Sequence, residues 1–280
     1  MKPARFDYVR ADSAEEAQSV LAQHGGGARI LAGGQSLVAM LNMRLAQPEV
    51  LVDISRVPGL AYIRADDGQL AIGAAATQSA LEALPDLHAQ VPLAARALPW
   101  ISHVQIKNKG TVCGSIAHAD PSAELPLVLA ALDGEVVLAS SSARRRVRAG
   151  DFFRGMLQTD CAADEMIVEV RLPLRARSAG FAFREVAQRQ GDFALVALAA
   201  VATPVECVLA VGGVADRPVV RRWPGLDSGQ VDDALNAFAW SLDAQDDAHA
   251  SASYRRHLVR VLGRQVLAQA QAEAQAEAQA

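Results

Sequence analysis

Two glycine-containing turns hold the residue types best suited to binding a phosphate group. The first lies in Arg29-Ile-Leu-Ala-Gly-Gly-Gln-Ser-Leu37, between a short apolar run and apolar residues spaced for one face of a helix. A strand–turn–helix arrangement directs backbone N–H groups toward an anion, and Gly33 and Gly34 allow the backbone to approach that anion closely. Taken alone, a glycine pair after a strand is more often only a tight turn.

The second turn, Gly110-Thr-Val-Cys-Gly-Ser115, adds hydroxyl groups to the same kind of backbone. A dinucleotide carries a pyrophosphate, and a chain without a large basic patch must neutralise it with N–H groups and hydroxyls. We expect one side of such a site from Gly33, Gly34, Gln35 and Ser36, and the other from Thr111, Gly114 and Ser115. Neither turn has the spacing of a nucleoside-triphosphate P-loop or of an NAD-binding Rossmann turn.

The histidines and cysteines do not suggest a second kind of chemistry. His118 lies in the second turn and His103 just before it, and cap or loop roles are the simpler interpretation of both. The sequence offers no nucleophile elbow and no histidine pair with metal-ligand spacing. Its three cysteines, Cys113, Cys161 and Cys207, are widely separated, which excludes an iron–sulfur or zinc site built on Cys-x-x-Cys pairs.

The composition is that of a globular protein. The 280 residues are 51% hydrophobic and 21% charged, with a formal net charge of −4, which argues against a nucleic-acid partner. The one basic run, Arg144-Arg-Arg-Val-Arg148, is predicted to be a solvated strand edge. No apolar stretch reaches transmembrane length and the N-terminus lacks a signal-peptide core, so we expect a cytoplasmic, reducing location.

Hydrophobic patterning predicts alternating small α and β elements. Strands at 6–9, 30–32 and 50–54 and a helix opened by the capping box Ser13-Ala-Glu-Glu16 form a first βαβαβ-like lobe. Further predictions are hairpins at 61–72 and 135–148, helices at 77–84, 86–98 with a break at Pro92, and 122–132, a loop at 100–110, strands at 166–170, 181–184, 194–201 and 207–211, and helices from 231 and 254. The Gln-Ala/Glu-Ala repeat after Gln269 has no hydrophobic face, which predicts a frayed or disordered tail.

Four segments carry a resemblance to one known family. They are Ala32-Gly-Gly-Gln-Ser-Leu37, Asn108-Lys-Gly-Thr-Val-Cys-Gly-Ser-Ile-Ala-His-Ala-Asp-Pro-Ser-Ala-Glu124, Asp151-Phe-Phe-Arg-Gly155 and Ala252-Ser-Tyr-Arg-Arg-His-Leu258. These segments occur in the family's order and span nearly the whole chain. The chain therefore resembles the medium, FAD-binding subunit of molybdenum hydroxylases of the carbon-monoxide-dehydrogenase and xanthine-dehydrogenase type.

The resemblance implies an α+β fold of the p-cresol methylhydroxylase type, in which two lobes bind FAD and the isoalloxazine lies against a C-terminal domain. The corresponding boundaries here are 1–57 for the first lobe, 58–175 for the second lobe, 176–268 for the C-terminal α+β flavoprotein domain and 269–280 for the tail.

The resemblance also implies a set of cofactor-binding residues, with the FAD pyrophosphate between the two turns. The set is Ile30, Leu31, Ala32, Gly33, Gly34, Gln35, Ser36, Leu37, Ile101, Thr111, Cys113, Gly114, Ser115, Glu124, Ile167, Arg184 and Phe193. Because Gln35 stands where a tethering histidine can occur in related flavoproteins, we expect FAD to be non-covalent. No catalytic side chain and no metal ligand is implied, since the flavin itself is the reactive group.

Three of these residues keep an alternative interpretation. Glu124 accepts hydrogen bonds from ribose hydroxyls, or it only places a negative charge at a helix N-terminus. Arg184 stabilises negative charge on the reduced ring, or it is a surface residue of a strand. Phe193, in Gly191-Asp-Phe193, covers the ring or packs in the core.

Cys113 departs from the family, which usually has glycine at this position. If the position requires positive φ, a cysteine costs about 1 kcal/mol or more and weakens FAD binding. If it does not, the small thiol fits beneath the cofactor.

The implied function is electron transfer within a larger complex. Electrons pass from a molybdopterin-binding large subunit through a [2Fe–2S] small subunit to this FAD and on to an external acceptor, in a dimer of heterotrimers. Two alternatives remain open: a stand-alone flavoprotein oxidase, and a scaffold subunit that has lost the cofactor. The sequence names neither the substrate, among purines, other heterocycles, aldehydes and CO, nor the acceptor, among NAD, quinones, cytochromes and oxygen.

Overall fold

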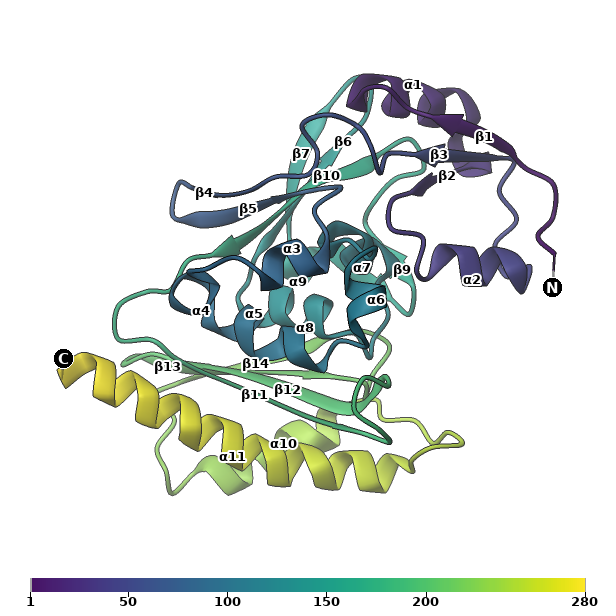
Figure 1. The fold of residues 1–280 in the computed structure, drawn as a ribbon. Helices are drawn as coiled ribbons and strands as arrows, with labels where there is room; N and C mark the ends of the chain where they lie inside the picture. The colour runs from purple at the N-terminus through teal and green to yellow at the C-terminus, as the bar shows by residue number, and fades with distance from the viewer. Residues whose placement is uncertain (1, 280) are drawn as a thin grey trace.

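The computed structural model describes residues 2–279, which form three main β-sheets with helices between and beneath them (Figure 1). The sheets follow one another along the chain, within residues 7–53, 63–173 and 180–224. Each of the three proposed structural ranges, 1–57, 58–175 and 176–268, therefore contains one of these three main sheets. The mixture of helices and strands confirms the expected α+β class.

The N-terminal sheet is small and fully parallel, in the order β1-β3-β2. Its elements are β1 (Asp7–Arg10), α1 (Ala14–His24), the 3₁₀ turn η1 (Gly25–Gly27), β2 (Ala28–Leu31), α2 (Leu37–Asn42) and β3 (Val50–Asp53). The predicted N-terminal cap is present, because the Ser13 hydroxyl accepts a hydrogen bond from the Glu16 amide. The Glu16 carboxylate accepts a bond from the Asp12 amide, where a strict capping box would use the Ser13 amide. The turns that follow β2 and β3 lie at the same carboxyl edge of the sheet.

The central sheet is antiparallel and has five strands in the order β4-β5-β10-β6-β7. These strands are β4 (Ile63–Asp66), β5 (Gln69–Gly73), β6 (Glu135–Ala139), β7 (Arg144–Arg148) and β10 (Met166–Pro173), with a small hairpin of β8 (Phe153–Gly155) and β9 (Gln158–Thr159) beside them. The basic strand β7 lies at the sheet edge, as predicted, and four acidic residues neutralise part of its charge: Asp133, Glu135, Asp160 and Glu165.

Short helices lie between the central sheet and the C-terminal sheet (Figure 1). They are α3 (Gln78–Glu82), α4 (Leu87–Gln90), α5 (Pro92–Ala97), η2 (Leu98–Trp100), α6 (Val104–Lys107), α7 (Val112–His118), α8 (Glu124–Ala131) and α9 (Ala149–Phe152). The predicted break at Pro92 is confirmed, since this proline begins α5. The predicted loop at 100–110 instead contains the one-turn helix α6, which is too short to leave a periodic apolar pattern.

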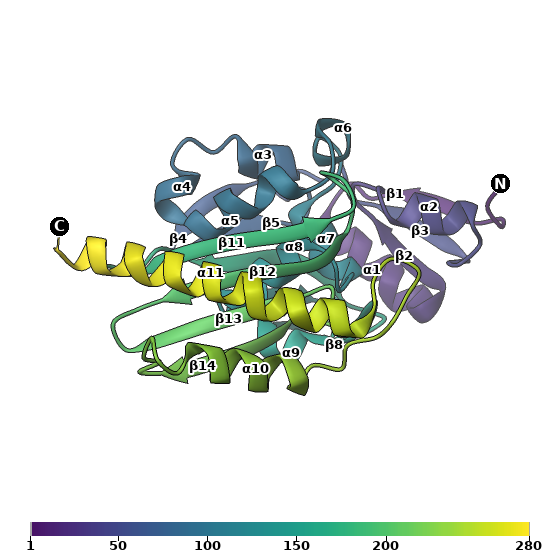
Figure 2. The same cartoon turned by 90° about the horizontal axis from the view of Figure 1, so that it is seen from below.

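The C-terminal sheet is an antiparallel meander with helices α10 and α11 on its outer face (Figure 2). Its elements are β11 (Gly180–Ala187), β12 (Ala194–Ala202), β13 (Glu206–Gly212), β14 (Val219–Pro224), α10 (Val231–Ser241) and α11 (Ala252–Gln279). Successive strand residues alternate between two hydrophobic clusters. Phe181 and Phe183 pack toward α5 and α8, whereas Ala182 packs toward α10 and α11.

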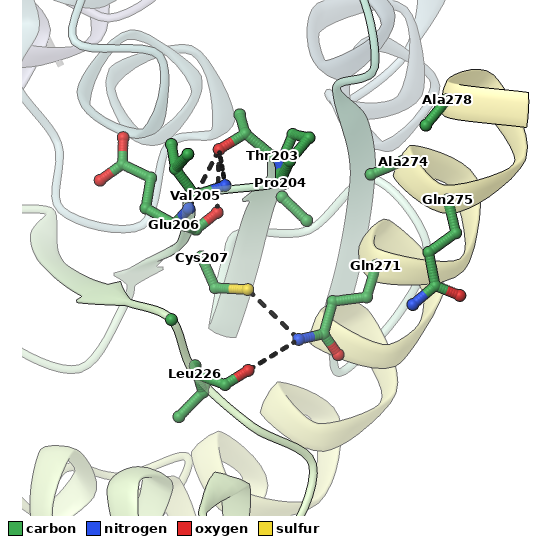
Figure 3. A pocket seen from close by; sticks show the side chains of 12 residues that line it. Thr203, Pro204, Val205, Glu206, Cys207, Leu226, Gln271, Ala274, Gln275 and Ala278 are labelled. Atoms are coloured by element: carbon green, nitrogen blue, oxygen red, sulfur yellow. Dashed lines mark hydrogen bonds between the residues drawn. The ribbon is translucent and has the colours of Figure 1, made fainter.

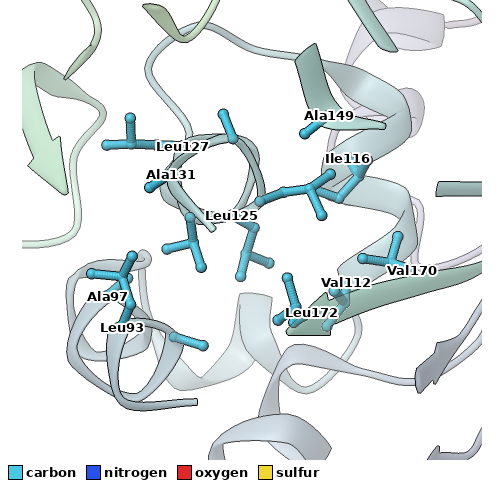
Figure 4. Close-up of a cluster of buried hydrophobic side chains, with 14 of the residues drawn as sticks. Leu93, Ala97, Val112, Ile116, Leu125, Leu127, Ala131, Ala149, Val170 and Leu172 are labelled. Atoms are coloured by element: carbon cyan, nitrogen blue, oxygen red, sulfur yellow. The ribbon is translucent and has the colours of Figure 1, made fainter. Parts of the chain in front are cut away.

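The largest hydrophobic cluster joins the second and third ranges into one core, because it includes Phe181 and Phe183 of the third range. Figure 4 shows part of the contribution from the second range: Leu93 and Ala97 of α5, Leu125 and Leu127 of α8 and Leu172 of β10. Because α8 is apolar on every side, it is buried on all sides, between the central sheet and the C-terminal sheet. This packing fixes the position of the α8 N-terminus relative to strand β11.

The expectation of a frayed tail is wrong for the part of the chain that the structure describes. Helix α11 continues to Gln279, and Ala270 and Ala274 are buried against Gly180 of β11. Glu273 forms ion pairs with Arg96 and Arg175 at N–O distances of 2.8 and 3.6 Å. Alanines four residues apart thus provide a narrow packing face that the hydrophobic pattern alone does not reveal. Among the helices of residues 2–279, none combines the length and apolar character needed to cross a bilayer.

Candidate functional site

The first glycine turn joins strand β2 to helix α2. Ile30 and Leu31 end the strand, Ala32 to Ser36 form the turn and Leu37 begins the helix. Gly34 has a φ of +70°, a conformation that favours glycine, and its carbonyl accepts the Val38 amide at 3.0 Å, at the start of the helix. The Gln35 side chain folds back, with Nε2 donating to the Gly33 carbonyl at 3.0 Å. The Ser36 hydroxyl makes no capping bond to α2 and is free to donate elsewhere.

The second turn precedes helix α7 and is tightly built. Thr111 caps the helix, since its Oγ1 accepts the Gly114 amide at 2.9 Å. A side chain at Gly114 would begin 2.6 Å from that hydroxyl, so glycine is needed for this cap. Thr111 also pairs with Thr77 in an isolated antiparallel bridge, which attaches the turn to the start of α3. Ser115 lies half-buried in the first turns of α7.

The structure brings the two turns into direct backbone contact. A Cβ placed on Gly33 would lie 2.0 Å from the Lys109 carbonyl oxygen and 2.8 Å from the Gly110 Cα. Only a residue without a side chain permits this approach. The two turns, separated by about eighty residues in sequence, therefore form one continuous backbone surface.

A cavity of about 350 Å³ lies at this junction. It is lined by Ala32, Gly33, Ser55, Arg56, Ala75, Thr77, Asn108, Lys109 and Thr111. Arg56 and Lys109 are exposed, and neither forms an ion pair within residues 2–279. The site thus presents two available cations, two threonine hydroxyls and closely packed backbone, a combination that fits a pyrophosphate.

The two cations were not predicted from the sequence. Arg56 follows strand β3, whose carboxyl edge is shared with β2, and ligands of parallel sheets commonly bind at that edge. Lys109 adjoins the second glycine turn. The order of the parallel strands is the signal that links Arg56 to the first turn, and it becomes visible only once the sheet is assembled.

Cys113 has a helical backbone and needs no positive φ. It is only 3% exposed, its Sγ donates to the Ile72 carbonyl at 3.4 Å, and burial raises the pKa of its thiol. The positive φ on which the first interpretation depends is therefore not required, because the thiol fits here without backbone strain. The cofactor-free scaffold alternative loses its only support from the sequence.

The two residues expected at the ring, Arg184 and Phe193, lie in strand β11 and in the turn that follows it, and two other residues of the expected set lie in the main hydrophobic cluster. Ile101 and Ile167 are buried in the main cluster, whereas Phe193 is 66% exposed in the β11–β12 turn. Phe193 is therefore not a core residue. Gly191 of the same turn has a φ of +86° and lies against residue 102, since a Cβ there would be 3.0 Å from the Ser102 carbonyl. This contact places the β11–β12 turn beside the segment that contains Ile101.

Glu124 begins helix α8 and is 7% exposed. Burial raises the pKa of Glu124 to about 7, and the negative charge of Asp120 contributes to the shift. Arg184 is not brought together with Glu124. It pairs in register with Leu198, which belongs to the cluster beneath α10 and α11, so it occupies the opposite face of β11 from Phe183.

A second cavity, of about 270 Å³, lies between the β12–β13 turn and the last turns of α11 (Figure 3). Gln271 spans it, with Nε2 donating to the Cys207 Sγ at 3.3 Å. Burial raises the pKa of the Cys207 thiol, so the group stays protonated. This cavity is on the α11 side of the sheet and holds none of the predicted site residues. Within residues 2–279, no group of three or more His, Cys, Asp or Glu residues is arranged to hold a metal ion.

Comparison with known proteins gives a consistent result. Residues 4–175 match a family described as the FAD binding domain in molybdopterin dehydrogenase. The chain is 39% identical to the 6-hydroxypseudooxynicotine dehydrogenase complex subunit alpha of Paenarthrobacter nicotinovorans, over 96% of both chains. It is 38% identical to the carbon monoxide dehydrogenase medium chain of Hydrogenophaga pseudoflava, over 72% of this chain and 70% of that one.

Solved structures show the same fold. Carbon monoxide dehydrogenase from Hydrogenophaga pseudoflava, in a form that lacks the Mo-pyranopterin moiety, superposes with a TM-score of 0.91 at 31% identity, over 98% of this chain and 99% of that chain. Quinoline 2-oxidoreductase from Pseudomonas putida 86 superposes with a TM-score of 0.89 at 34% identity, with the same coverage.

Proposed function

Because this chain belongs to the FAD-binding subunits of the molybdenum hydroxylase family, we propose that it transfers electrons from a [2Fe–2S] partner subunit through FAD to an external acceptor. The observation that carries the proposal is the backbone contact between Gly33 and Lys109. It joins two glycine turns into one surface beside a cavity that is lined by Arg56 and Lys109.

The residues of this surface have separate tasks. Backbone around Gly33 and the hydroxyls of Thr77 and Thr111 surround the pyrophosphate, and Arg56 and Lys109 offset its charge. Phe193 has the exposure needed to cover the ring. When bound, FAD supplies the redox chemistry that no side chain offers, and the chain holds it and shapes its electrostatic surroundings.

The partners follow from the same assignment. Relatives carry names such as medium chain and complex subunit, so we place the molybdenum cofactor and the iron–sulfur clusters on a large and a small partner subunit, in a dimer of heterotrimers. Those relatives are named for substrates as different as carbon monoxide and 6-hydroxypseudooxynicotine. Substrate selection therefore belongs to the large subunit in this proposal.

We assign the complex to the cytoplasm. The assignment rests on the three cysteines, all of which are free thiols, as is usual in a reducing compartment.

The proposal is tested on the complex purified from its native host. The complex is prepared with FAD, and again after FAD removal, and its clusters are reduced with a limiting amount of dithionite. NAD, a quinone and oxygen are then added in turn while the iron–sulfur signal is followed. We expect at least one acceptor to reoxidise the clusters rapidly only when FAD is present.

Two results would contradict the proposal. Equal reoxidation without FAD would mean that electrons bypass this chain. A flavin-containing chain that purifies alone and oxidises a substrate without partners would instead be an independent oxidase.

A further inference from the structure

The tip of the β8–β9 hairpin consists of two large apolar side chains that face solvent. Gly155 pairs with Gln158, so Met156 and Leu157 form the two-residue turn between the strands. Met156 is 61% exposed and Leu157 is 46% exposed. Turn positions favour Gly, Pro, Asn, Asp and Ser, so the turn itself does not explain two adjacent apolar side chains.

The backbone at Leu157 is a second unfavourable feature of the same tip. Its φ is +56°, in the left-handed region that favours glycine or asparagine. Within residues 2–279, Leu157 is the only large apolar residue with a positive φ. Neither the strained φ nor the exposed leucine stabilises the isolated fold, and backbone strain of this kind is concentrated at functional positions.

The hairpin is held from two sides, although its tip is exposed. The Leu157 amide donates to the Ala119 carbonyl at 3.2 Å, at the C-terminal end of α7. The Arg217 guanidinium, in the turn between β13 and β14, donates to the Arg154 carbonyl at 2.8 Å. Both bonds use backbone groups of the hairpin, so they fix its direction and leave the apolar side chains exposed. A tip that is ordered before binding loses little conformational entropy when it binds.

The bond to Ala119 relates the tip to the cofactor cavity. Helix α7 has seven residues, which corresponds to a length of about 10 Å. Its N-terminal cap, Thr111, lines the cavity, and its C-terminal cap, Ala119, holds Leu157. Figure 1 shows β9 beside α7, on the side of the molecule toward α2. The tip therefore lies about one short helix away from the cavity.

We propose that Met156 and Leu157 dock this chain onto its iron–sulfur partner subunit, which receives the two side chains in an apolar pocket of its own surface. The inference rests on the proposed function. Relatives are named as complex subunits and medium chains, so a partner surface exists to cover the tip. An electron donor must sit close to the cofactor, and the tip is an uncharged, ordered contact point near the cavity. Methionine and other apolar side chains are typical of the buried centre of an interface.

The test compares assembly of the complex with stability of the isolated chain. The complex is purified from its native host through a tag on this chain, as the wild type and with Leu157→Asn, Met156→Gln or the control Val205→Thr. Asparagine tolerates a positive φ, so Leu157→Asn removes the apolar group and relieves the backbone. Val205 is 74% exposed and precedes β13, whereas Arg217, which holds the hairpin, follows that strand.

The predicted result is a loss of assembly without a loss of stability. We expect Leu157→Asn to weaken binding of the iron–sulfur subunit by at least about tenfold, measured as the iron–sulfur absorbance that stays with this chain on dilution. Met156→Gln should weaken it in the same direction, and it decides the matter if Leu157→Asn does not fold. Val205→Thr should assemble as the wild type does. The urea midpoint of the isolated Leu157→Asn chain should equal or exceed that of the wild type, whereas a purely structural role would lower it.

Three results would overturn the role of the tip and leave the proposed function intact. The first is wild-type assembly of both tip variants. The second is loss of the large subunit, or of self-association, while the iron–sulfur subunit stays bound. The third is weaker FAD binding by the isolated Leu157→Asn chain, which would mean that the tip contacts the cofactor. A wild-type complex that contains FAD but no iron–sulfur subunit would instead overturn the proposed function.

Discussion

Gly33 and Lys109 touch backbone to backbone, with only 2.0 Å between the Lys109 carbonyl oxygen and the point where a Cβ on Gly33 would lie. This contact brings residues from two lobes to one cavity. It explains why the first glycine of the pair cannot carry a side chain, while the second is required for its positive φ. The two glycines thus serve different physical needs.

The cations at the cavity should contribute to FAD affinity. Arg56→Gln and Lys109→Gln are each expected to weaken FAD binding by about three- to tenfold, because both charges are exposed and partly screened. Titrations at low and high salt should show a smaller salt dependence in each variant. Arg29→Gln is the control, because Arg29 is exposed, does not line the cavity and donates to the Gly26 and Ala28 carbonyls. Equal affinities for all variants would remove the cations from the site.

Replacing Cys113 by the family's glycine should cost stability without improving FAD binding. Cys113→Gly removes a buried thiol from helix α7 and adds a flexible residue, so we expect the free energy of unfolding to fall by about 1–2 kcal/mol. Urea denaturation measures this change. FAD affinity should stay within about threefold of the wild type. A tenfold gain in affinity would show that the thiol obstructs the cofactor.

The end of helix α11 should contribute to folding. A Cβ on Gly180 would lie 1.9 Å from the Ala270 carbonyl and 2.5 Å from the Ala274 amide, so Gly180→Ala should destabilise the chain by about 2 kcal/mol or more. Gly150→Ala, in a helix with open space around its Cα, is the matched control and should be neutral or slightly stabilising. Equal stability of the two variants would mean that α11 does not pack there in solution.

The free energy of unfolding of the FAD-free chain should fall as the pH rises from about 4.5 to about 8. Burial, with a smaller contribution from the charge of Glu124, raises the folded-state pKa of Glu185 in strand β11 to about 8. The folded chain therefore holds a proton that the unfolded chain releases near pH 4.5. Its contribution to stability is therefore complete below about pH 4.5 and is lost as the pH rises toward 8. Urea denaturation across this range should give a flatter profile for Glu185→Gln. An unchanged profile would mean that Glu185 is solvated.

Much of the fold could be predicted because its elements have strong local signals. The helix cap at Ser13, the break at Pro92 and the alternation of Phe181 and Phe183 each follow from nearby residues. The helical end of α11 could not be predicted, since its packing depends on alanines meeting the distant Gly180. A local sequence pattern cannot reveal this contact, because its other partner is a glycine about ninety residues away that has no side chain.

The candidate site likewise has features that the sequence reveals and features that appear only in the folded chain. Both glycine turns could be identified from their residue types, but their contact depends on how the N-terminal sheet packs against the central sheet. Arg56 was missed because it does not stand in a recognisable motif. It is identified by the edge of the sheet that it shares with the first turn.

The most direct test of the account is FAD affinity in Gly33→Ala, compared with Gly26→Ala as a control in the same lobe. Gly26 has open space around it and no positive φ. We predict that Gly33→Ala separates the two turns and weakens FAD binding by at least about tenfold, or 1.4 kcal/mol, while Gly26→Ala binds as the wild type does. Wild-type affinity in a folded Gly33→Ala chain would contradict the claim that the junction of the two turns binds the cofactor.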